Sequence, residues 1–556
     1  MSDKKPAAGE WWRGCVIYQI YPRSFQDTTG DGGGDLAGVV RRLGHVAWLG
    51  VDAVWLSPFF QSPMADMGYD VSDYCAVDPL FGTLADFDAV VAEAHRLGLK
   101  VIIDQVLAHT SDRHPWFVES RKSRGNAKAD WYVWAEPKSD GTAPNNWLSV
   151  FGGSAWEWDS VRRQYYLHNF LASQPALNYH NGDVQDAVLE TVRFWLARGV
   201  DGFRLDTVNY YVQDRFLRDN PPLAESVAGE NTDTNPYNFQ EHLFDKSRPE
   251  NIDFLKRFRA LIDEGGGRAV VGEIGDEERS LQTLAAYTSG GDKLNMSYTF
   301  DMLGPEFTAG HFRTRMAKFF AGAPNGWPCW SFSNHDVNRH MTRWAPYSRN
   351  SADLARQAAA MLLSFKGSVC LYQGEELGLP EADILFEELT DPPGIRFWPE
   401  YKGRDGARTP MPWEEGEAPN GFSSVKPWLP VKPNHSALNV AAQNADPDST
   451  LNFYRRALAF RRAHPVFASG DIEFLKVAEP LLAFRRTGKD GAITCLFNLS
   501  ADSITVTLSG GEGVEPLELS NGAARRKNKL KLEANGFVFF GTGQMNVAFG
   551  GRRRRS

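Results

Sequence analysis

The sequence contains little cysteine, with five residues among 556, at positions 15, 75, 329, 370 and 495. So few and so scattered, they exclude a disulfide framework and a clustered zinc site, and they suit a reducing cytoplasm. The chain also lacks any apolar run of about 18 residues, and its first ten residues, MSDKKPAAGE, contain no apolar signal region. We therefore expect a cytoplasmic protein with no membrane partner.

An excess of positive charge is also absent, because the formal net charge is −9. Binding to a nucleic-acid backbone requires a basic surface, so we expect no nucleic-acid partner. Hydrophobic residues make up 42% of the chain and charged residues 23%, which excludes disorder as the main state. A single hydrophobic core rarely exceeds about 250–300 residues, so a chain of this length predicts at least two domains.

The first 110 residues alternate apolar strands with amphipathic helices. Strands are expected at 14–22, 51–58 and 100–109, and helices with apolar spacings of three and four at 36–50 and 84–99. The strands lack polar–apolar alternation, which is typical of a parallel sheet buried on both faces.

The same rhythm returns later in the chain and predicts an α/β fold, a (β/α)8 TIM barrel. An open doubly wound sheet is the alternative, but no GxGxxG turn follows the first strand. An irregular region at 112–181 is expected to be a small domain inserted after strand 3, and the short strands from 467 to 556 an antiparallel β domain. The barrel would then comprise 1–111 and 182–466. Its later strands are expected at 201–206, 268–273, 293–300, 329–334 and 367–374.

Polar residues follow several of these strands, at the barrel face where such folds carry their active sites. Arg204 and Asp206 alternate along GFRLD and point to one side, so the guanidinium favours an ionised carboxylate, as a nucleophile requires. Glu273 ends an apolar run, and its desolvation would suit a general acid. His335 and Asp336 follow the seventh strand. A structural Arg–Asp pair and a surface glutamate are the alternatives, but carboxylates after strands four, five and seven favour glycoside hydrolysis.

Ten segments in the same order resemble those of the α-amylase superfamily, glycoside hydrolase family 13, in its exo-acting α-glucosidase and oligo-1,6-glucosidase branch. They run from residue 17 to residue 413, and the C-terminal β domain also fits that family. The segments are IYQIYPRSF, GVDAVWLSPFF, MGYDVSDY, DQVLAHTS, QPALN, GFRLDTVN, GEIGD, FSNHD, GEELGLP and RDGARTPMPW.

The resemblance implies a role for each of three carboxylates. Asp206 would be the nucleophile that forms a covalent β-glucosyl ester, and Glu273 the acid/base. Asp336 would bind the 2- and 3-hydroxyls of the sugar, through bonds that strengthen toward the oxocarbenium-like transition state.

The resemblance also implies residues that surround one sugar. His109 and His335 would donate hydrogen bonds to it, Arg204 would orient the nucleophile, and Tyr69 would stack near the anomeric centre. Asp66 and Arg404 resemble an ion pair that closes the pocket beyond one sugar and makes the enzyme exo-acting. Arg408 is the less favoured partner of Asp66. Thr207 resembles the residue of α-1,4-specific relatives, where valine accompanies α-1,6 preference.

The loop DTTGDGGGD predicts a structural Ca²⁺ or Mg²⁺ site, because it places oxygen atoms at alternating positions. A plain acidic turn is the alternative. The expected ligands are Asp27, Thr29, Asp31, Gly33 and Asp35. Elsewhere, Ala108 and Ala176 stand where the resemblance would require oxygen ligands for an interdomain calcium, so we expect that calcium to be absent. No organic cofactor is expected.

Three functions remain at this point. The first is a retaining exo-α-glucosidase acting on maltose and short maltooligosaccharides, with sucrose as a further candidate and transglucosylation when an alcohol or sugar outcompetes water. The second is a sucrose-directed glucosyltransferase or isomerase of the same fold. The third is a non-catalytic interaction protein, which the intact carboxylates disfavour. A monomer or homodimer is expected.

Overall fold

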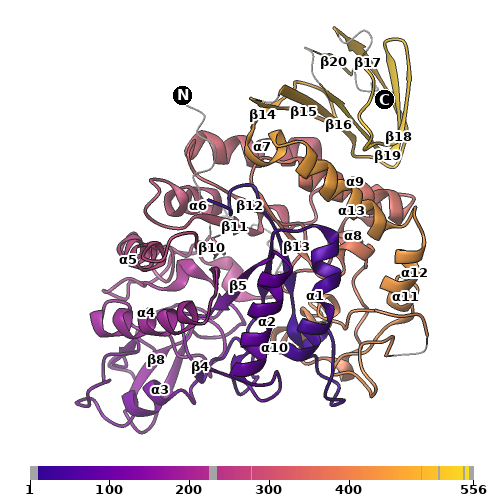
Figure 1. The fold of residues 1–556 in the computed structure, drawn as a ribbon. Coiled ribbons are helices and arrows are strands. Elements are labelled where there is room, and N and C mark those ends of the chain that lie inside the picture. Colours follow the sequence, from indigo (N-terminus) through magenta and orange to yellow (C-terminus); the bar gives the residue numbers. More distant parts are fainter. Residues whose placement is uncertain are drawn as a thin grey trace.

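The computed structural model describes residues 10–223, 234–276, 279–416, 419–489, 491–510, 514–541 and 545–549. Figure 1 shows a barrel surrounded by helices and, above it in yellow, a sheet formed by the C-terminal part of the chain. No helix of the described ranges is long and apolar enough to cross a membrane. The C-terminal residues 550–556, which include four consecutive arginines, lie outside the described residues.

Eight parallel strands in the described part of the chain form the barrel, in the order β11-β10-β9-β5-β2-β1-β13-β12. A single parallel bridge between Ser297 and Pro328 joins the two edges, so the barrel is nearly closed. The predicted TIM barrel is confirmed, with a strand inside each of the eight expected ranges except that β10 extends one residue further. The strands are β1 (Val16–Ile20), β2 (Ala53–Leu56), β5 (Lys100–Gln105), β9 (Gly202–Leu205), β10 (Ala269–Ile274), β11 (Met296–Thr299), β12 (Cys329–Trp330) and β13 (Ser368–Tyr372).

The helices that surround the barrel begin at polar caps. Asp35 accepts a hydrogen bond from the backbone of Gly38 at the start of α1, and Gly50 ends that helix with a left-handed φ of 93°. Thr83 and Asp86 form a capping box at the start of α2. The main barrel helices are α1 (Leu36–Leu49), α2 (Leu84–Arg96), α4 (Gly182–Ala197), α5 (Asn251–Asp263), α6 (Ser280–Thr288), α7 (Ala309–Gly322), α9 (Ser351–Ser364) and α13 (Thr450–Ala463).

A small three-stranded sheet lies between β5 and β9 in the chain, where the inserted region is expected. Its strands are β6 (Trp134–Ala135), β8 (Gln164–Leu167) and β7 (Trp156–Asp159), with α3 (Pro115–Ser120) before them. Trp147 and Trp156 are buried in its core, with their rings stacked at 5.9 Å. These two tryptophans fill the core beside the small sheet. A separate hairpin, β3 (Phe60–Gln61) and β4 (Asp73–Val77), follows β2.

The C-terminal strands form an antiparallel sheet, as predicted. Its described strands are β14 (Asp471–Phe474), β15 (Leu481–Gly488), β16 (Gly491–Asn498), β17 (Ile504–Ser509), β18 (Asn521–Arg526), β19 (Lys529–Gly541) and β20 (Asn546–Ala548). Phe537 and Phe539 of β19 pack against Phe453 and Phe460 of α13. This aromatic contact joins the sheet to the barrel helices.

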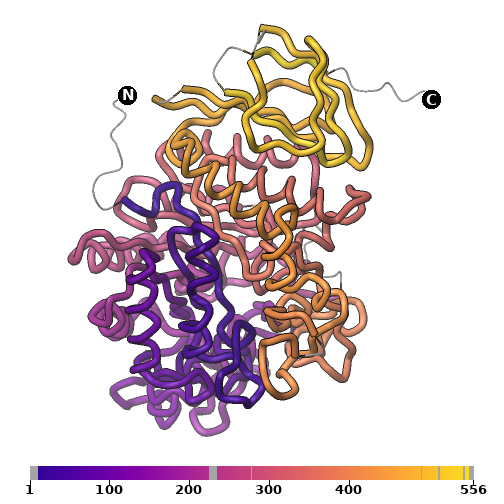
Figure 2. The backbone as a smooth tube through the Cα atoms, turned by 45° about the vertical axis from the view of Figure 1, so that its right-hand side comes forward, coloured from indigo at the N-terminus to yellow at the C-terminus, as the bar shows by residue number. Residues whose placement is uncertain are grey.

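Two long segments, 207–250 and 376–440, follow β9 and β13 at the carboxyl ends of these strands. The second contains the short helices α10 (Pro392–Arg396) and α11 (Pro433–Ser436), and α12 (Val440–Ala445) begins at its end. In Figure 2 its orange tube lies at the end of the barrel away from the yellow sheet, near the purple inserted region. Residues 224–233 of the first segment lie outside the described residues.

Candidate active site

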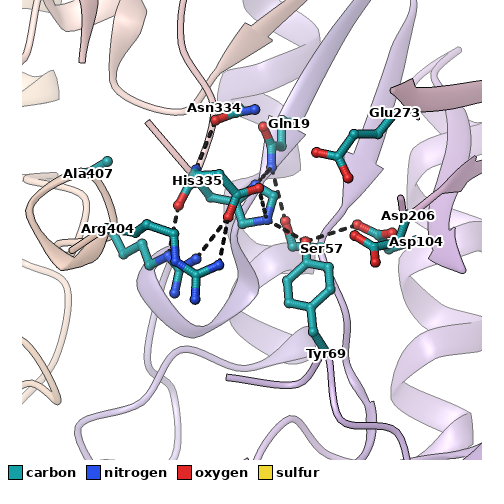
Figure 3. Close-up of polar contacts among 12 residues, drawn as sticks. Gln19, Ser57, Tyr69, Asp104, Asp206, Glu273, Asn334, His335, Arg404 and Ala407 are labelled. Atoms are coloured by element: carbon teal, nitrogen blue, oxygen red, sulfur yellow. Dashed lines mark hydrogen bonds and ion pairs between the residues drawn. The ribbon is translucent and has the colours of Figure 1, made fainter. Parts of the chain in front are cut away.

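Arg204 of β9 joins three carboxylates from three neighbouring strands. Its Nη1 lies 2.8 Å from Asp104 Oδ1 and 2.7 Å from Asp206 Oδ1, and its Nη2 lies 2.7 Å from Glu273 Oε2. β5, β9 and β10 are adjacent in the barrel, so their carboxyl ends bring these side chains together. Figure 3 shows Glu273, Asp206 and Asp104 on one side of the site. The structure therefore places Asp206 and Glu273 on one shared guanidinium.

Burial dominates the titration of this cluster. It raises the pKa of Asp206 and of Glu273 each to about 7, against the opposing charge of Arg204. It also raises the pKa of Asp104 to about 6. Together, the three carboxyls that share this guanidinium therefore retain a proton near neutral pH. Glycoside hydrolysis needs this state, because one carboxyl donates a proton while another attacks as an anion.

Thr207 contacts both carboxyls of the expected catalytic pair. Its backbone N–H donates to Glu273 Oε2 at 3.0 Å, and its hydroxyl donates to Asp206 Oδ2 at 3.1 Å. The residue has φ 39° and ψ 47°, a left-handed conformation that is strained for a β-branched side chain. This conformation directs the N–H toward Glu273 while the side chain stays beside the nucleophile.

Tyr69 and His335 lie at the centre of the site in Figure 3. Their rings stack at 5.3 Å with an angle of 9°, and Tyr69 Oη hydrogen-bonds His335 Nε2. Tyr69 also donates to Asp104 Oδ2 at 3.2 Å, and Gln19 Nε2 lies 2.8 Å from His335 Nδ1. Burial lowers the pKa of His335, so the ring is neutral near pH 7.

Asp336 lies among cationic and polar groups. Its Oδ1 is 3.2 Å from Arg404 Nη1 and 3.0 Å from Arg408 Nη2, and its Oδ2 is 3.2 Å from His335 Nε2. Burial alone would raise the pKa of Asp336, but His335 and the two arginines outweigh it and hold that pKa below its ordinary value. Its side chain is 17% exposed, against 8% for Asp206 and 4% for Glu273. Asp336 is thus an ionised carboxylate on the more open side of the site.

The predicted pair Asp66 and Arg404 is in contact, with Nη2 at 2.9 Å from Oδ1. Burial raises the pKa of Asp66 to about 6, and Arg404 opposes this rise. Arg408, the less favoured partner, instead contacts Asp336. The amide of Gln174 donates to Asp66 Oδ2 at 3.0 Å and lies 3.1 Å from His109 Nε2.

His109 is buried beside this pair. Its Nε2 lies 3.0 Å from the carbonyl oxygen of Tyr69, and its Nδ1 has no hydrogen-bond partner among the described residues. Burial lowers the pKa of His109 to about 4, so the ring is neutral near pH 7. This Nδ1 atom is itself buried, so the nitrogen without a partner is not exposed to a sugar hydroxyl.

Polar residues of the site that were not identified from the sequence include Gln174, Asp391 and Tyr298, together with Gln19 beside His335. Gln174 bridges Asp66 and His109, Asp391 binds Arg404, and Tyr298 contacts Arg204 and Glu273. Tyr298 carried a usable signal, because a polar aromatic at an inward position of an expected barrel strand faces the same interior as Arg204. Asp391 carried none, since it lies in a long segment without periodicity.

The carboxylates of the 27–35 loop are engaged by the loop itself. Asp27 accepts hydrogen bonds from the backbones of Thr29, Gly30 and Gly32 and from the hydroxyl of Ser423. Asp35 caps α1, and Asp31 accepts from the Gly33 backbone.

Within the described ranges no three histidine, cysteine or acidic side chains converge so as to hold a metal ion. The loop cation therefore stays a prediction. The expected absence of an interdomain calcium near the buried residues Ala108 and Ala176 also stays a prediction.

Comparison with known proteins gives a consistent result. Residues 19–470 match the family model described as the α-amylase catalytic domain. The chain is 59% identical over 512 residues to a probable α-glucosidase of Rhizobium meliloti (strain 1021), covering 92% of this chain and 93% of that protein. It is 36% identical over 533 residues to an oligo-1,6-glucosidase of Heyndrickxia coagulans, covering 89% and 93%.

Two solved structures are also similar to this chain in fold and in sequence. The α-glucosyl transfer enzyme XgtA superposes with a TM-score of 0.93 at 51% identity, covering 97% of this chain and 100% of that one. A variant of the trehalulose synthase MutB superposes with a TM-score of 0.86 at 31% identity, covering 96% and 100%.

Proposed function

Because the chain belongs to the α-amylase family, glycoside hydrolase family 13, and is an enzyme of the α-glucosidase class, we propose that it is a retaining exo-α-glucosidase. It would remove terminal non-reducing α-linked glucose from maltose and short maltooligosaccharides. The observation that carries this proposal is the Arg204 guanidinium shared by Asp206 and Glu273. The non-catalytic interpretation is wrong, because the relatives are enzymes.

Asp206 is proposed as the nucleophile. Its carboxylate attacks the anomeric carbon while Glu273 donates a proton to the glycosidic oxygen, so the leaving sugar departs as an alcohol. The product is a β-glucosyl ester on Asp206. Glu273, now ionised, takes a proton from water, whose oxygen displaces Asp206 and restores the α configuration. Two carboxylates on one guanidinium favour the separation of about 5–5.5 Å that retaining enzymes use, since inverting enzymes need room for a water molecule.

The exo mode rests on Asp66 and Arg404. Their ion pair lies beside Asp336, which is proposed to bind the 2- and 3-hydroxyls of the same sugar. The ion pair would close the pocket at this point, so that one glucose fits. Its charged groups would act as donors and acceptors at the 4-hydroxyl of that glucose. His109, His335 and Tyr69 are proposed to surround that glucose.

Thr207 is proposed to set the α-1,4 preference, because it contacts Asp206 and would border the leaving sugar. An alcohol or sugar in place of water would give transglucosylation. A sucrose-directed isomerase or transferase is the second candidate, favoured by the likeness to XgtA and to the trehalulose synthase MutB. A structural Ca²⁺ or Mg²⁺ in the 27–35 loop and a monomeric or dimeric state remain part of the proposal.

Turnover of p-nitrophenyl α-glucoside, maltose and sucrose tests the proposal. We expect nitrophenol and glucose as products, and Asp206→Ala to lower kcat by more than about 10³-fold. Asp88→Ala is the matched control, because Asp88 lies on the outer helix α2 and pairs with Arg198. Absence of turnover on every α-glucoside would refute the glucosidase class. An isomer of sucrose as the main product would favour the second candidate.

A further inference from the structure

Tyr298 of β11 lies inside the barrel and contacts two residues of the proposed catalytic set. Its hydroxyl oxygen accepts hydrogen bonds from Arg204 Nε at 3.2 Å and Nη2 at 2.8 Å. The same hydroxyl donates to Glu273 Oε1 at 3.1 Å. The side chain is 4% exposed, and β11 pairs with β10 so that Tyr298 lies directly opposite Glu273. The strand register and the side-chain hydrogen bond therefore both place Tyr298 beside Glu273.

The direction of these hydrogen bonds is determined by chemistry. A guanidinium only donates, so both Arg204 contacts use the lone pairs of the phenol oxygen. The one phenol proton is left for Glu273. Burial raises the pKa of Tyr298 well above its ordinary value, so the phenol keeps that proton at every pH at which the enzyme would act.

Glu273 is thereby held by two hydrogen-bond donors and one ion pair. Oε1 accepts from Tyr298, Oε2 accepts from the Thr207 backbone, and Oε2 also lies 2.7 Å from Arg204 Nη2 as an ion pair. Donors to a carboxylate stabilise its ionised form and lower its pKa. Burial and the negative charges of Asp206 and Asp336 act in the opposite direction. Asp104 of β5, on the far side of Arg204, adds a further negative charge.

We propose that Tyr298 is a positioning residue that fixes the Glu273 carboxyl at Oε1 and sets its affinity for a proton. The inference rests on the proposed glycosidase function. With Oε1 accepting from Tyr298, the proton of the acid form resides on Oε2. A protonated Oε2 loses its ion pair with Arg204 and accepts more weakly from Thr207, and its O–H becomes the donor to the glycosidic oxygen.

Tyr298→Phe tests this role through the pH profile of kcat/KM. The basic limb of that profile reports the acid that must be protonated in the free enzyme, here Glu273. Loss of the donor raises the pKa of Glu273, so we expect the basic limb to move up by about one pH unit. Tyr179→Phe is the matched control: it removes a buried hydroxyl that donates to the Leu107 carbonyl, away from the carboxylates.

A second readout compares leaving groups. A misplaced acid slows maltose, whose sugar leaving group needs protonation, more than p-nitrophenyl α-glucoside, whose nitrophenolate leaves without it. We expect Tyr298→Phe to lower kcat/KM for maltose by about tenfold more than for the aryl glucoside. General damage to the fold would lower both equally.

An isosteric variant keeps the test decisive if Tyr298→Phe folds poorly. Replacement of Tyr298 by 3-fluorotyrosine makes the phenol a stronger donor, so the basic limb should move down. An unchanged basic limb in both variants, with equal losses on the two substrates, would overturn the role of Tyr298 while wild-type turnover left the proposed function intact. Absence of wild-type turnover on any α-glucoside would instead refute the proposed function.

Discussion

Asp391 binds Arg404 through three nitrogen atoms: its carboxylate accepts from the backbone N–H at 2.8 Å, from Nε at 3.0 Å and from Nη2 at 2.6 Å. Asp391 is fully buried, and the charge of Arg404 outweighs the cost of that burial and lowers the pKa of Asp391. Asp391 thus occupies the Nε–Nη2 edge of the guanidinium. Nη1 remains to contact Asp336, and Nη2 also contacts Asp66. Asp391 therefore orients the cation that closes the proposed sugar site.

Asp391→Asn should weaken sugar binding more than the chemical step. The amide cannot match the charge or the two acceptors of the carboxylate, so Arg404 loses its fixed orientation. We expect KM for maltose to rise about tenfold, with a smaller change in kcat. Asp383→Asn, at an exposed ion pair in the same segment, is the control. A maltose analogue that lacks the non-reducing 4-hydroxyl gives a further check. The loss of kcat/KM caused by removing this hydroxyl should be smaller in Asp391→Asn than in the wild type. Equal losses in both would contradict a coupling between Asp391 and the 4-hydroxyl.

Much of the fold was predictable because its signals are local. Each barrel strand is a short apolar run, and the helices between them show caps and apolar spacing within single turns. The confirmed barrel then predicts which residues share a face, so Asp206, Glu273 and Asp336 could be assigned to one barrel mouth from strand ends alone.

The residues that the sequence did not identify act through contacts that cannot be inferred from their positions in the sequence. Asp391 reaches Arg404 from within a segment without periodicity, and Gln174 reaches Asp66 across 108 residues. Tyr298 lies in an expected strand, but its importance arises from the register that places it opposite Glu273. Such pairings depend on strand order and loop conformation, which hydrophobic patterning does not specify.

Thr207→Val should shift linkage preference toward α-1,6. Valine keeps the volume of threonine but removes the hydroxyl that donates to Asp206 Oδ2. Changes of this size discriminate between substrates by about 1–3 kcal/mol, so we expect the ratio of kcat/KM for isomaltose to that for maltose to rise about tenfold. Thr207→Ser retains the hydroxyl and serves as the control. A ratio that stays constant in Thr207→Val would remove this residue from linkage selection.

His435 should make the chain less stable in acid. Burial lowers its pKa in the folded chain to about 4, whereas an unfolded histidine titrates near about 6.5. Between these values the unfolded chain binds more protons, so the stabilisation is complete above about pH 6.5 and is lost as pH falls toward 4. The loss amounts to about 3 kcal/mol, from about 1.4 kcal/mol per pH unit.

Denaturant unfolding of His435→Gln at pH 7 and pH 5 measures this contribution. The variant should show a smaller difference in unfolding free energy between the two pH values than the wild-type chain. His464→Gln, at the end of α13, is the comparison. Equal pH dependence in His435→Gln and the wild type would show that His435 does not titrate in this way.

Metal removal tests the 27–35 loop. A cation bound only by the folded chain would stabilise it by mass action, so a chelator should lower Tm and added Ca²⁺ or Mg²⁺ should restore it. Asp31→Asn should abolish the response to metal, because Asp31 has the fewest loop hydrogen bonds of the three carboxylates. A wild-type Tm that is unaffected by chelator and by metal would support the plain acidic turn.

The covalent ester on Asp206 can be tested directly by trapping with 5-fluoro-α-D-glucosyl fluoride followed by peptide mass spectrometry. The fluorine slows both steps, and the activated leaving group restores the first, so the ester accumulates. We expect one fluoroglucosyl group per chain, located on Asp206, with no label in Asp206→Ala. A label on Glu273 or Asp336, or turnover without any covalent species in the wild type, would contradict this expectation.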